Sequence, residues 1–283
     1  MKQVNWDEVL FRCSCIGKIM ADGKGSVLTE KQAERIVELQ NKESRTPKQE
    51  EELITLTAKR DAPPTLGDTC ISYLKEVYIW EKYGKEPVGG SERSKYTMKG
   101  KLVEEESIMM LSRIDSQTYT KNDKRYKSSF LTGEPDIVVT SNDTITKIID
   151  IKSSYDFATL LSNIGSPLNP LYKYQVNGYM ALTGALEAEV CYCLVNMPQE
   201  MINSEKKRIF YALNAATEES PEYVRQVSKL DNNATFDEVP IRERVIRFPV
   251  QYDYTLMEKV YKRIEQCRAW LKEFDSFHEK LNR

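Results

Sequence analysis

Three charged residues lie at the ends of two short apolar segments near the middle of the chain. In the first segment, residues 133–139 (GEPDIVV), Asp136 comes directly before the apolar residues. In the second segment, residues 148–152 (IIDIK), Asp150 and Lys152 lie at the end. Both segments read as adjacent strands, and side chains two apart on a strand point to the same face. Two carboxylates beside an ammonium group suit a divalent cation, because Mg²⁺ takes oxygen ligands. The alternative is a hairpin with charged ends on its surface, and the Gly-x-Pro-Asp start favours the metal site.

A third acidic side chain is expected from a helix upstream. Residues 99–111 have the apolar spacing of a helix. Glu104 shares one face with Ile108 and Leu111 and should point inward, whereas Glu105 falls on a polar face. Acidic residues also favour helix N-termini, so a solvated acidic first turn is the alternative. Glu104 is therefore the preferred helix-borne acid, with Glu105 as the other possibility.

Two polar residues are expected to face the same region from a helix downstream. Residues 172–180 (YKYQVNGYM) read as a helix, in which Gln175 and Tyr179 are four apart and hence on one face. Taken alone, this pair is equally explained by a half-buried helix face.

In their order and context, these residues resemble the PD-(D/E)xK nuclease superfamily. Glu104, Asp136, Asp150-x-Lys152 and Gln175-x-x-x-Tyr179 are similar to its RecB/YqaJ branch, which includes phage lambda-type exonucleases, over roughly residues 95–200. The resemblance implies an α/β fold with a restriction-endonuclease-like core, in which helices flank a central mixed sheet, and an N-terminal helical lobe. It also implies a metal-dependent DNA nuclease, and first a phage-type exonuclease that resects double-stranded DNA for recombination. The alternatives are a RecB-like or structure-specific endonuclease, and a catalytically idle DNA-binding or assembly module.

The resemblance also implies a role for each site residue. The ligand set for Mg²⁺ or Mn²⁺, with two ions per site, would be Asp136, Asp150, Glu104 and the peptide carbonyl of Ile151. Lys152 would orient the attacking water or help to deprotonate it. Gln175 and Tyr179 would position Lys152, water or phosphate. Two metal ions about 3.5–4 Å apart stabilise both the attacking and the leaving oxygen of a phosphodiester.

A weaker similarity lies near the N-terminus. Residues 12–20 (RCSCIGKIM) are similar to the segment that grips a terminal phosphate in phage exonucleases, which implies that Ser14, with Arg12 and Lys18, binds the DNA end. One departure is that the family's basic partner normally lies further upstream of the serine, where this chain has Asp7. The alternative is that residues 13–20 are the apolar face of an N-terminal helix.

The overall charge of the chain restricts the kind of DNA binding that we expect. A net charge of −2 argues against passive DNA coating, but it is compatible with a nuclease whose acidic site offsets a local basic groove. Candidate phosphate contacts are Lys121, Lys124, Arg125, Lys127 and the run Lys206-Lys207-Arg208.

The resemblance implies a duplex DNA end as substrate, a single-strand annealing protein as a possible partner, and a possible homo-oligomer. No apolar run has transmembrane length and no signal peptide is evident, so the expected location is the cytoplasm, that of the host if a phage encodes the chain.

The six cysteines suggest structural rather than metal-binding roles. Some RecB-type relatives hold an iron–sulfur cluster with three cysteines near the C-terminus, where this chain has only Cys267. Cys191 and Cys193 lie in an apolar strand and are predicted to be buried thiols.

The remaining pattern predicts two domains. Residues 1–94 form an N-terminal segment and a helical lobe, with helices at about 29–43, 47–59 and 66–83, and the lobe either shapes the DNA channel or is a mere insertion. Residues 95–283 form the nuclease core with a C-terminal helix at 253–281. Within the core, a crossover through the Gln175 helix should bring strand 188–196 beside the earlier strands. Helices at 199–207 and 221–229 and strands at 208–212 and 242–248 should follow.

Overall fold

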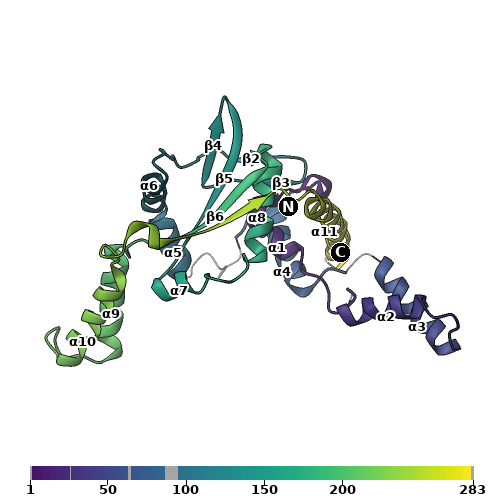
Figure 1. Cartoon of the computed structure of the whole chain (residues 1–283), viewed down its shortest axis with the longest axis horizontal. Coiled ribbons are helices and arrows are strands. Elements are labelled where there is room, and N and C mark those ends of the chain that lie inside the picture. The colour runs from purple at the N-terminus through teal and green to yellow at the C-terminus, as the bar shows by residue number, and fades with distance from the viewer. Residues whose placement is uncertain (1, 26, 63–64, 87–94, 282–283) are drawn as a thin grey trace. The chain divides into compact units, whose positions relative to one another are not determined.

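The computed structural model describes residues 2–25, 27–62, 65–86 and 95–281, which form two compact units (Figure 1). The first unit comprises Met1–Val9, Cys15–Pro87 and Glu258–Arg283, and the second comprises Leu10–Ser14 and Val88–Met257. The domain boundary predicted after residue 94 falls at residues outside the described part. The C-terminal helix, which the sequence places with the core, instead groups almost entirely with the N-terminal helices.

The second unit contains both sheets. Its elements are β1 (Phe11–Arg12), α5 (Lys95–Leu102), α6 (Glu104–Asp115), β2 (Tyr126–Lys127), β3 (Leu131–Gly133), β4 (Ile137–Ser141), β5 (Thr144–Ser153), α7 (Phe157–Leu161), α8 (Pro170–Thr183), β6 (Glu187–Cys193), α9 (Gln199–Ala212), α10 (Pro221–Ala234), η4 (Ile241–Arg244) and β7 (Val245–Gln251). The first unit contains η1 (Trp6–Glu8), α1 (Ile16–Ile19), α2 (Glu30–Gln40), α3 (Pro47–Asp61), α4 (Asp68–Tyr83) and most of α11 (Tyr254–Leu281), while η2 (Cys13–Cys15) spans the boundary.

The larger sheet is mixed and has the strand order β4-β5-β6-β7. Strands β4 and β5 are antiparallel, β5 and β6 are parallel, and β6 and β7 are antiparallel. The parallel pair is joined through α8, so the predicted crossover is confirmed. A smaller sheet has the order β1-β3-β2, in which Phe11 pairs with Leu131 from a distant part of the chain.

The hairpin between β4 and β5 sets the positions of the acidic residues. Ser141 pairs with Thr144, so the loop consists of Asn142 and Asp143, both with positive φ (49° and 59°). Two successive left-handed residues make the tight turn whose twist matches a hairpin, and Asn and Asp tolerate this conformation. The register then pairs Ile137 with Ile149 at the other end of the hairpin.

Alternation along β5 separates the two faces of the sheet. Ile149 and Ile151 are buried in a core cluster with Ile108 and Leu111 of α6. Asp150, which lies between the two isoleucines, instead contacts α8, so the helices approach β5 from opposite faces (Figure 1). One face of β5 therefore packs Ile149 and Ile151 against α6, while the other turns Asp150 toward α8. Cys191 and Cys193 of β6 belong to the same core cluster and are free and buried, as predicted.

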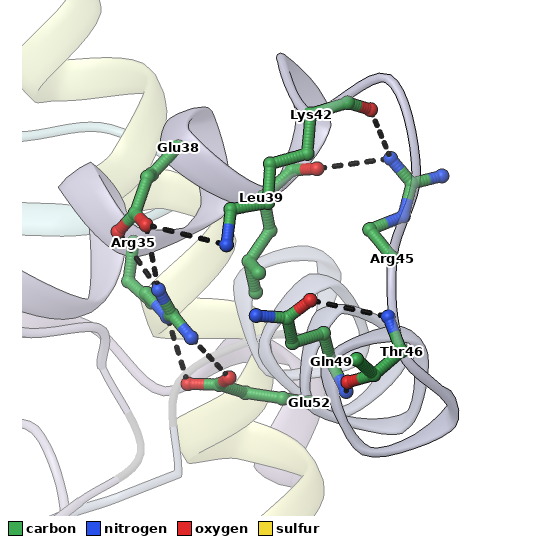
Figure 2. A network of polar contacts seen from close by, with 8 residues as sticks. All are labelled: Arg35, Glu38, Leu39, Lys42, Arg45, Thr46, Gln49 and Glu52. Atoms are coloured by element: carbon green, nitrogen blue, oxygen red, sulfur yellow. Dashed lines mark hydrogen bonds and ion pairs between the residues drawn. The ribbon is translucent and has the colours of Figure 1, made fainter.

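The first unit includes a polar helical hairpin made by α2 and α3, as the sequence predicts. Thr29 and Thr46 begin the two helices with reciprocal capping boxes. Figure 2 shows how side chains join them: both terminal nitrogens of Arg35 pair with acids, Glu38 on its own helix and Glu52 on α3. Arg45 of the connecting loop donates to the carbonyl of Leu39. Ion pairs and caps thus supplement the few apolar contacts of this hairpin.

The same unit joins α4 to α11 through a buried cluster of polar side chains. The ammonium group of Lys82 lies 2.6 Å from Asp275 Oδ1 and 3.1 Å from Glu279 Oε1. Trp6 Nε1 and the Tyr78 hydroxyl also donate to Asp275, over 2.8 and 2.7 Å. We refer to Trp6, Tyr78, Lys82 and Asp275 as the α4–α11 clasp.

Two details of the predicted secondary structure are wrong. Residues 208–212, predicted as a short strand, complete helix α9, because Phe210 packs edge-on against Tyr223 of α10. The last strand begins at Val245 rather than at residue 242, since residues 241–244 form a 3₁₀ turn. None of the helices in the described part of the chain is both long and apolar enough to span a membrane.

Candidate active site

Two aspartates meet at the end of the β4–β5 hairpin. Ile137 pairs with Ile149 at this end. Asp136 directly precedes Ile137, and Asp150 directly follows Ile149. The Asp136 Oδ2 atom accepts a hydrogen bond of 2.6 Å from the backbone N–H of Ile151. Burial, and then the nearby charge of Asp150, raise the pKa of Asp136 to about 7, although Lys152 opposes the shift. The two carboxylates are therefore close enough to repel each other when both are ionised.

Lys152 points into the same site. Its Nζ atom lies 2.7 Å from Asp150 Oδ2, donates to Gln175 Oε1 over 3.3 Å, and sits 4.6 Å from the ring centroid of Tyr172. Burial opposes the charge of Lys152, but Asp150 and Asp136 outweigh burial and raise its pKa. The carboxylates and the aromatic ring thus hold the ammonium group on the polar face of β5.

Helix α8 supplies Gln175 and Tyr179, both buried. Asn169 caps the start of this helix, Pro170 occupies its first turn, and Gly184 ends it with φ 80°. The Gln175 Nε2 atom donates to Asp150 Oδ1 over 3.0 Å and to the Tyr179 hydroxyl oxygen over 2.9 Å. The predicted shared face of Gln175 and Tyr179 therefore contacts the acidic strand end.

Glu104 approaches from the start of α6. It is half-buried above Ile108 and Leu111, whereas Glu105 and Glu106 are exposed. Its Oε2 atom accepts a hydrogen bond of 3.0 Å from Lys121 Nζ. The charge of Glu104 also contributes to the raised pKa of Asp136, which places Glu104 within electrostatic range of the aspartates. Of the two candidate acids, Glu104 is half-buried and within electrostatic range of Asp136, whereas Glu105 is exposed.

Within the part of the chain that the structure describes, the Asp150 carboxylate has one oxygen whose only partner is an ammonium group. Asp150 is fully buried, and among the described residues its Oδ2 atom has no hydrogen-bond or ion-pair partner other than Lys152 Nζ, 2.7 Å away. In the same part of the chain, no three His, Cys, Asp or Glu side chains converge to hold a metal by themselves. Two carboxylates with a peptide carbonyl nonetheless fit Mg²⁺, which binds through one or two carboxylates and keeps water or phosphate as its other ligands.

A polar cavity of about 230 Å³ has Tyr179 of α8 on its lining. Its lining consists of Arg12, Cys13, Ser14, Arg125, Thr132, Gly133, Glu134 and Tyr179. The Arg125 guanidinium pairs with Glu134 over 2.8 Å. We refer to this cavity as the Ser14 pocket. Lys18, predicted to act with Ser14, belongs to the first unit, where its Nζ lies 5.3 Å from the ring centroid of Tyr73.

Gly133 allows the Ser14 pocket and the aspartate site to lie side by side. A Cβ atom at this position would lie 2.7 Å from Tyr179 Cε1 and 2.9 Å from Cys13 Sγ. Both distances are shorter than real contacts, so any side chain at position 133 would displace Tyr179 or Cys13.

The structure places two residues, Arg125 and Tyr172, at sites to which the sequence analysis did not assign them. Arg125, expected as a duplex phosphate contact, lines the Ser14 pocket. Tyr172 lies under Lys152, and its position one turn before Gln175 was the available signal, because residues three apart share a helix face.

Solved structures have the same architecture. A phage-related exonuclease from Haemophilus somnus 129PT is similar over 96% of this chain and 97% of its own, with a TM-score of 0.63 and 21% sequence identity. The alkaline exonuclease LHK-Exo from Laribacter hongkongensis is similar over 98% of this chain and 96% of its own, with a TM-score of 0.56 and 12% identity. This chain has the fold of these exonucleases. The predicted fold class is therefore confirmed.

A structure of LHK-Exo in complex with dAMP is also similar, over 88% of this chain and 91% of its own, with a TM-score of 0.50 and 12% identity. No protein-family model matches the sequence, and no curated protein matches it either.

Proposed function

We propose that the protein is a divalent-metal-dependent deoxyribonuclease and that it acts as an exonuclease on the ends of duplex DNA. The observation that carries the proposal is the pair Asp136 and Asp150 beside Lys152. Among the described residues, a single lysine faces both carboxylates: Asp150 Oδ2 has only the Lys152 ammonium as its partner, and the pKa of Asp136 is raised to about 7. A purely structural cluster would gain stability by balancing these charges, whereas a cation-binding site leaves them for its ligand.

Lys152 and Gln175 have clear tasks in such a reaction. A phosphodiester resists hydrolysis because its negative charge repels nucleophiles and its alkoxide is a poor leaving group. The Lys152 ammonium would orient the attacking water and offset the negative charge that develops in the transition state. Gln175 accepts from Lys152 and donates to Asp150, so its amide holds both side chains in one geometry.

The cation would be Mg²⁺ or Mn²⁺, held by Asp136, Asp150, Glu104 and the carbonyl of Ile151. When bound, it would supply the Lewis-acid stabilisation that the attacking and leaving oxygens of a phosphodiester need. The donor set supports this assignment because all four ligands are oxygens.

Two observations support an exonuclease. The chain has the fold of a phage-related exonuclease and of the alkaline exonuclease LHK-Exo. A structure of LHK-Exo in complex with dAMP has the same fold. The Ser14 pocket, with Arg12 and Arg125 on its lining, shares Tyr179 with the aspartate site. Guanidinium groups and hydroxyl donors suit a terminal phosphate, because the phosphate gains charge-assisted hydrogen bonds. An end bound there would present a nearby phosphodiester to Asp136 and Asp150.

Digestion of end-labelled linear, nicked and closed circular duplexes with Mg²⁺ or Mn²⁺ tests the proposal. An exonuclease should degrade linear DNA progressively from an end, leave closed circles intact, and lose all activity in EDTA. Cleavage of closed circles would instead identify an endonuclease with the same chemistry. Failure to cut any duplex under either metal would leave the fold as a DNA-binding module and would contradict the proposal.

A further inference from the structure

Helix α5, which precedes Glu104, has an inverted pattern of burial. Lys99 is 0% exposed, whereas Met98 and Leu102 on the same short helix are 50% and 51% exposed. A surface helix normally buries its apolar residues and leaves lysine in water. The burial of Lys99 must therefore depend on what its ammonium group contacts.

The Lys99 ammonium is bound by backbone at the exit of β5. Its Nζ atom donates to the carbonyl oxygens of Ser154 and Tyr155, each over 2.9 Å. The rings of Tyr155 and Phe236 enclose it, with centroids 5.9 and 5.6 Å away. A buried ammonium is costly unless it is hydrogen-bonded, and charge-assisted bonds to two carbonyls are strong enough to hold it.

Both carbonyls belong to the segment that follows the aspartate site. Ser154 is two residues beyond Lys152, and its own N–H donates to the Cys193 carbonyl of β6 over 2.8 Å. The Lys99 side chain is thus anchored to backbone that is hydrogen-bonded to the central sheet.

The backbone of Lys99 fixes the start of the next helix. Its carbonyl accepts a hydrogen bond of 3.0 Å from the N–H of Val103, the fully buried N-cap of α6. Glu104 is the first residue after this cap. One residue therefore connects the rigid end of β5 to the turn from which Glu104 projects.

We propose that Lys99 is a positioning residue that sets the location of Glu104 relative to Asp136 and Asp150. The inference rests on the proposed function, in which Glu104 completes the cation site. Without the two bonds at Ser154 and Tyr155, the α5–α6 junction loses its polar tie to the end of β5. The apolar packing of Val103, Ile108 and Leu111 is what then remains, so Glu104 shifts away from the aspartates. A misplacement of about 1 Å in a reacting constellation costs on the order of 10²-fold in rate.

The test compares Lys99→Met with Lys82→Met in the full-length protein. Both changes remove a buried ammonium group, but Lys82 belongs to the α4–α11 clasp and is assigned no part in the chemistry. Lys99→Met should lower kcat on linear duplex DNA by about 10–10²-fold. It should also raise the Mg²⁺ concentration that gives half-maximal rate, and leave the KM for DNA within twofold. Lys82→Met should lower the melting temperature yet keep the wild-type kcat and Mg²⁺ dependence.

A purely structural role would give a different result. If Lys99→Met loses melting temperature but keeps the wild-type kcat and Mg²⁺ dependence, the positioning role is overturned. If Lys99→Met does not fold, Lys99→Gln, which keeps N–H donors on a shorter chain, is measured by the same criteria. If the wild-type protein hydrolyses no DNA with Mg²⁺ or Mn²⁺, the proposed function is overturned as well. If the wild type is active and the Lys99 variants keep its kcat and Mg²⁺ dependence, only this inference is overturned.

Discussion

Each compact unit contains a lysine–aspartate ion pair with one buried partner, and the two pairs differ in how many donors each aspartate has. In the α4–α11 clasp, Asp275 accepts hydrogen bonds from Trp6, Tyr78 and Lys82. Burial alone would raise the pKa of Asp275, but these donors outweigh it and lower the pKa below its ordinary value. The clasp is a closed network that needs no further ligand.

The aspartate site has the opposite balance. Lys152 pairs with Asp150 Oδ2, but Asp136 adds a second carboxylate, so one lysine faces two acidic groups. The pKa of Asp136 is raised to about 7, while that of Asp275 is lowered. The same two residue types therefore give a stabilising contact in one unit and, in our account, a cation site in the other. Excess negative charge, rather than the lysine–aspartate pair itself, distinguishes the aspartate site from the clasp.

The largest expected difference is between Asp150→Asn and Asp275→Asn. Asp150→Asn keeps the shape of the site but removes a ligand charge, so kcat should fall by at least about 10²–10³-fold, as after loss of one electrostatic group from an active site. Folding and DNA binding should be retained. Asp275→Asn should keep kcat and lower the free energy of unfolding by about 3 kcal/mol, because it leaves the buried Lys82 ammonium with the exposed Glu279 as its only acidic partner among the described residues. Initial rates and urea unfolding measure both, and wild-type turnover in Asp150→Asn would reject the site.

A finer test separates neighbouring acids on α6. Glu104→Gln should reduce the rate of DNA cleavage by about 10²-fold, since it removes a charge that faces the aspartates. Glu105→Gln should stay within about twofold, the behaviour of an exposed surface substitution. The comparison is made from initial rates at saturating Mg²⁺. The reverse ranking would move the assignment to Glu105.

The α4–α11 clasp should also affect how the free energy of unfolding changes with pH. Because the pKa of Asp275 is lowered by folding, its contribution is complete above the unfolded value of about 3.9 and is lost as the pH falls through the folded value. Below about pH 4, the free energy of unfolding should therefore fall more steeply for the wild type than for Asp275→Asn. Urea unfolding at pH 6 and at successive values down to pH 3 measures this difference. Parallel curves would show that the clasp does not depend on the Asp275 charge.

The smallest expected effect concerns the DNA end. A linear duplex with a 5′-phosphate should be degraded about 10-fold faster than its hydroxyl-ended twin, the equivalent of one good charge-assisted hydrogen bond. Ser14→Ala should narrow that ratio without changing the rate on the hydroxyl-ended duplex. Equal rates on both duplexes, unchanged by Ser14→Ala, would remove end recognition by the Ser14 pocket and leave the nuclease proposal intact.

Local features of the fold could be predicted from the sequence. The β4–β5 hairpin follows from two apolar segments and the Asn142–Asp143 turn, and the capping boxes at Thr29 and Thr46 start the helices of the polar hairpin. Residues two apart on β5 and four apart on α8 were correctly expected to share faces. Each of these conclusions depends on neighbours in the chain, for which periodicity and turn chemistry are sufficient.

Features that depend on distant contacts could not be predicted. Strand β1 pairs with β3, which brings Ser14 into a cavity with Arg125, and this register has no local signal. The burial of Lys99 contradicts its residue type, because the carbonyls that bind it lie far along the chain. The grouping of α11 with the N-terminal helices likewise follows from contacts such as Lys82 with Asp275.

The most direct test of the central claim is a Mg²⁺ titration of DNA hydrolysis, after the protein has been stripped of metal with EDTA. Wild-type protein, Asp136→Asn and Asp275→Asn are compared on the same end-labelled linear duplex. We predict no hydrolysis without Mg²⁺, saturable hydrolysis by the wild type, the same half-saturating Mg²⁺ concentration for Asp275→Asn, and no recovery of Asp136→Asn at any concentration. The account would be contradicted if metal-free protein hydrolysed DNA, or if the Mg²⁺ dependence of hydrolysis by Asp136→Asn matched that of the wild type.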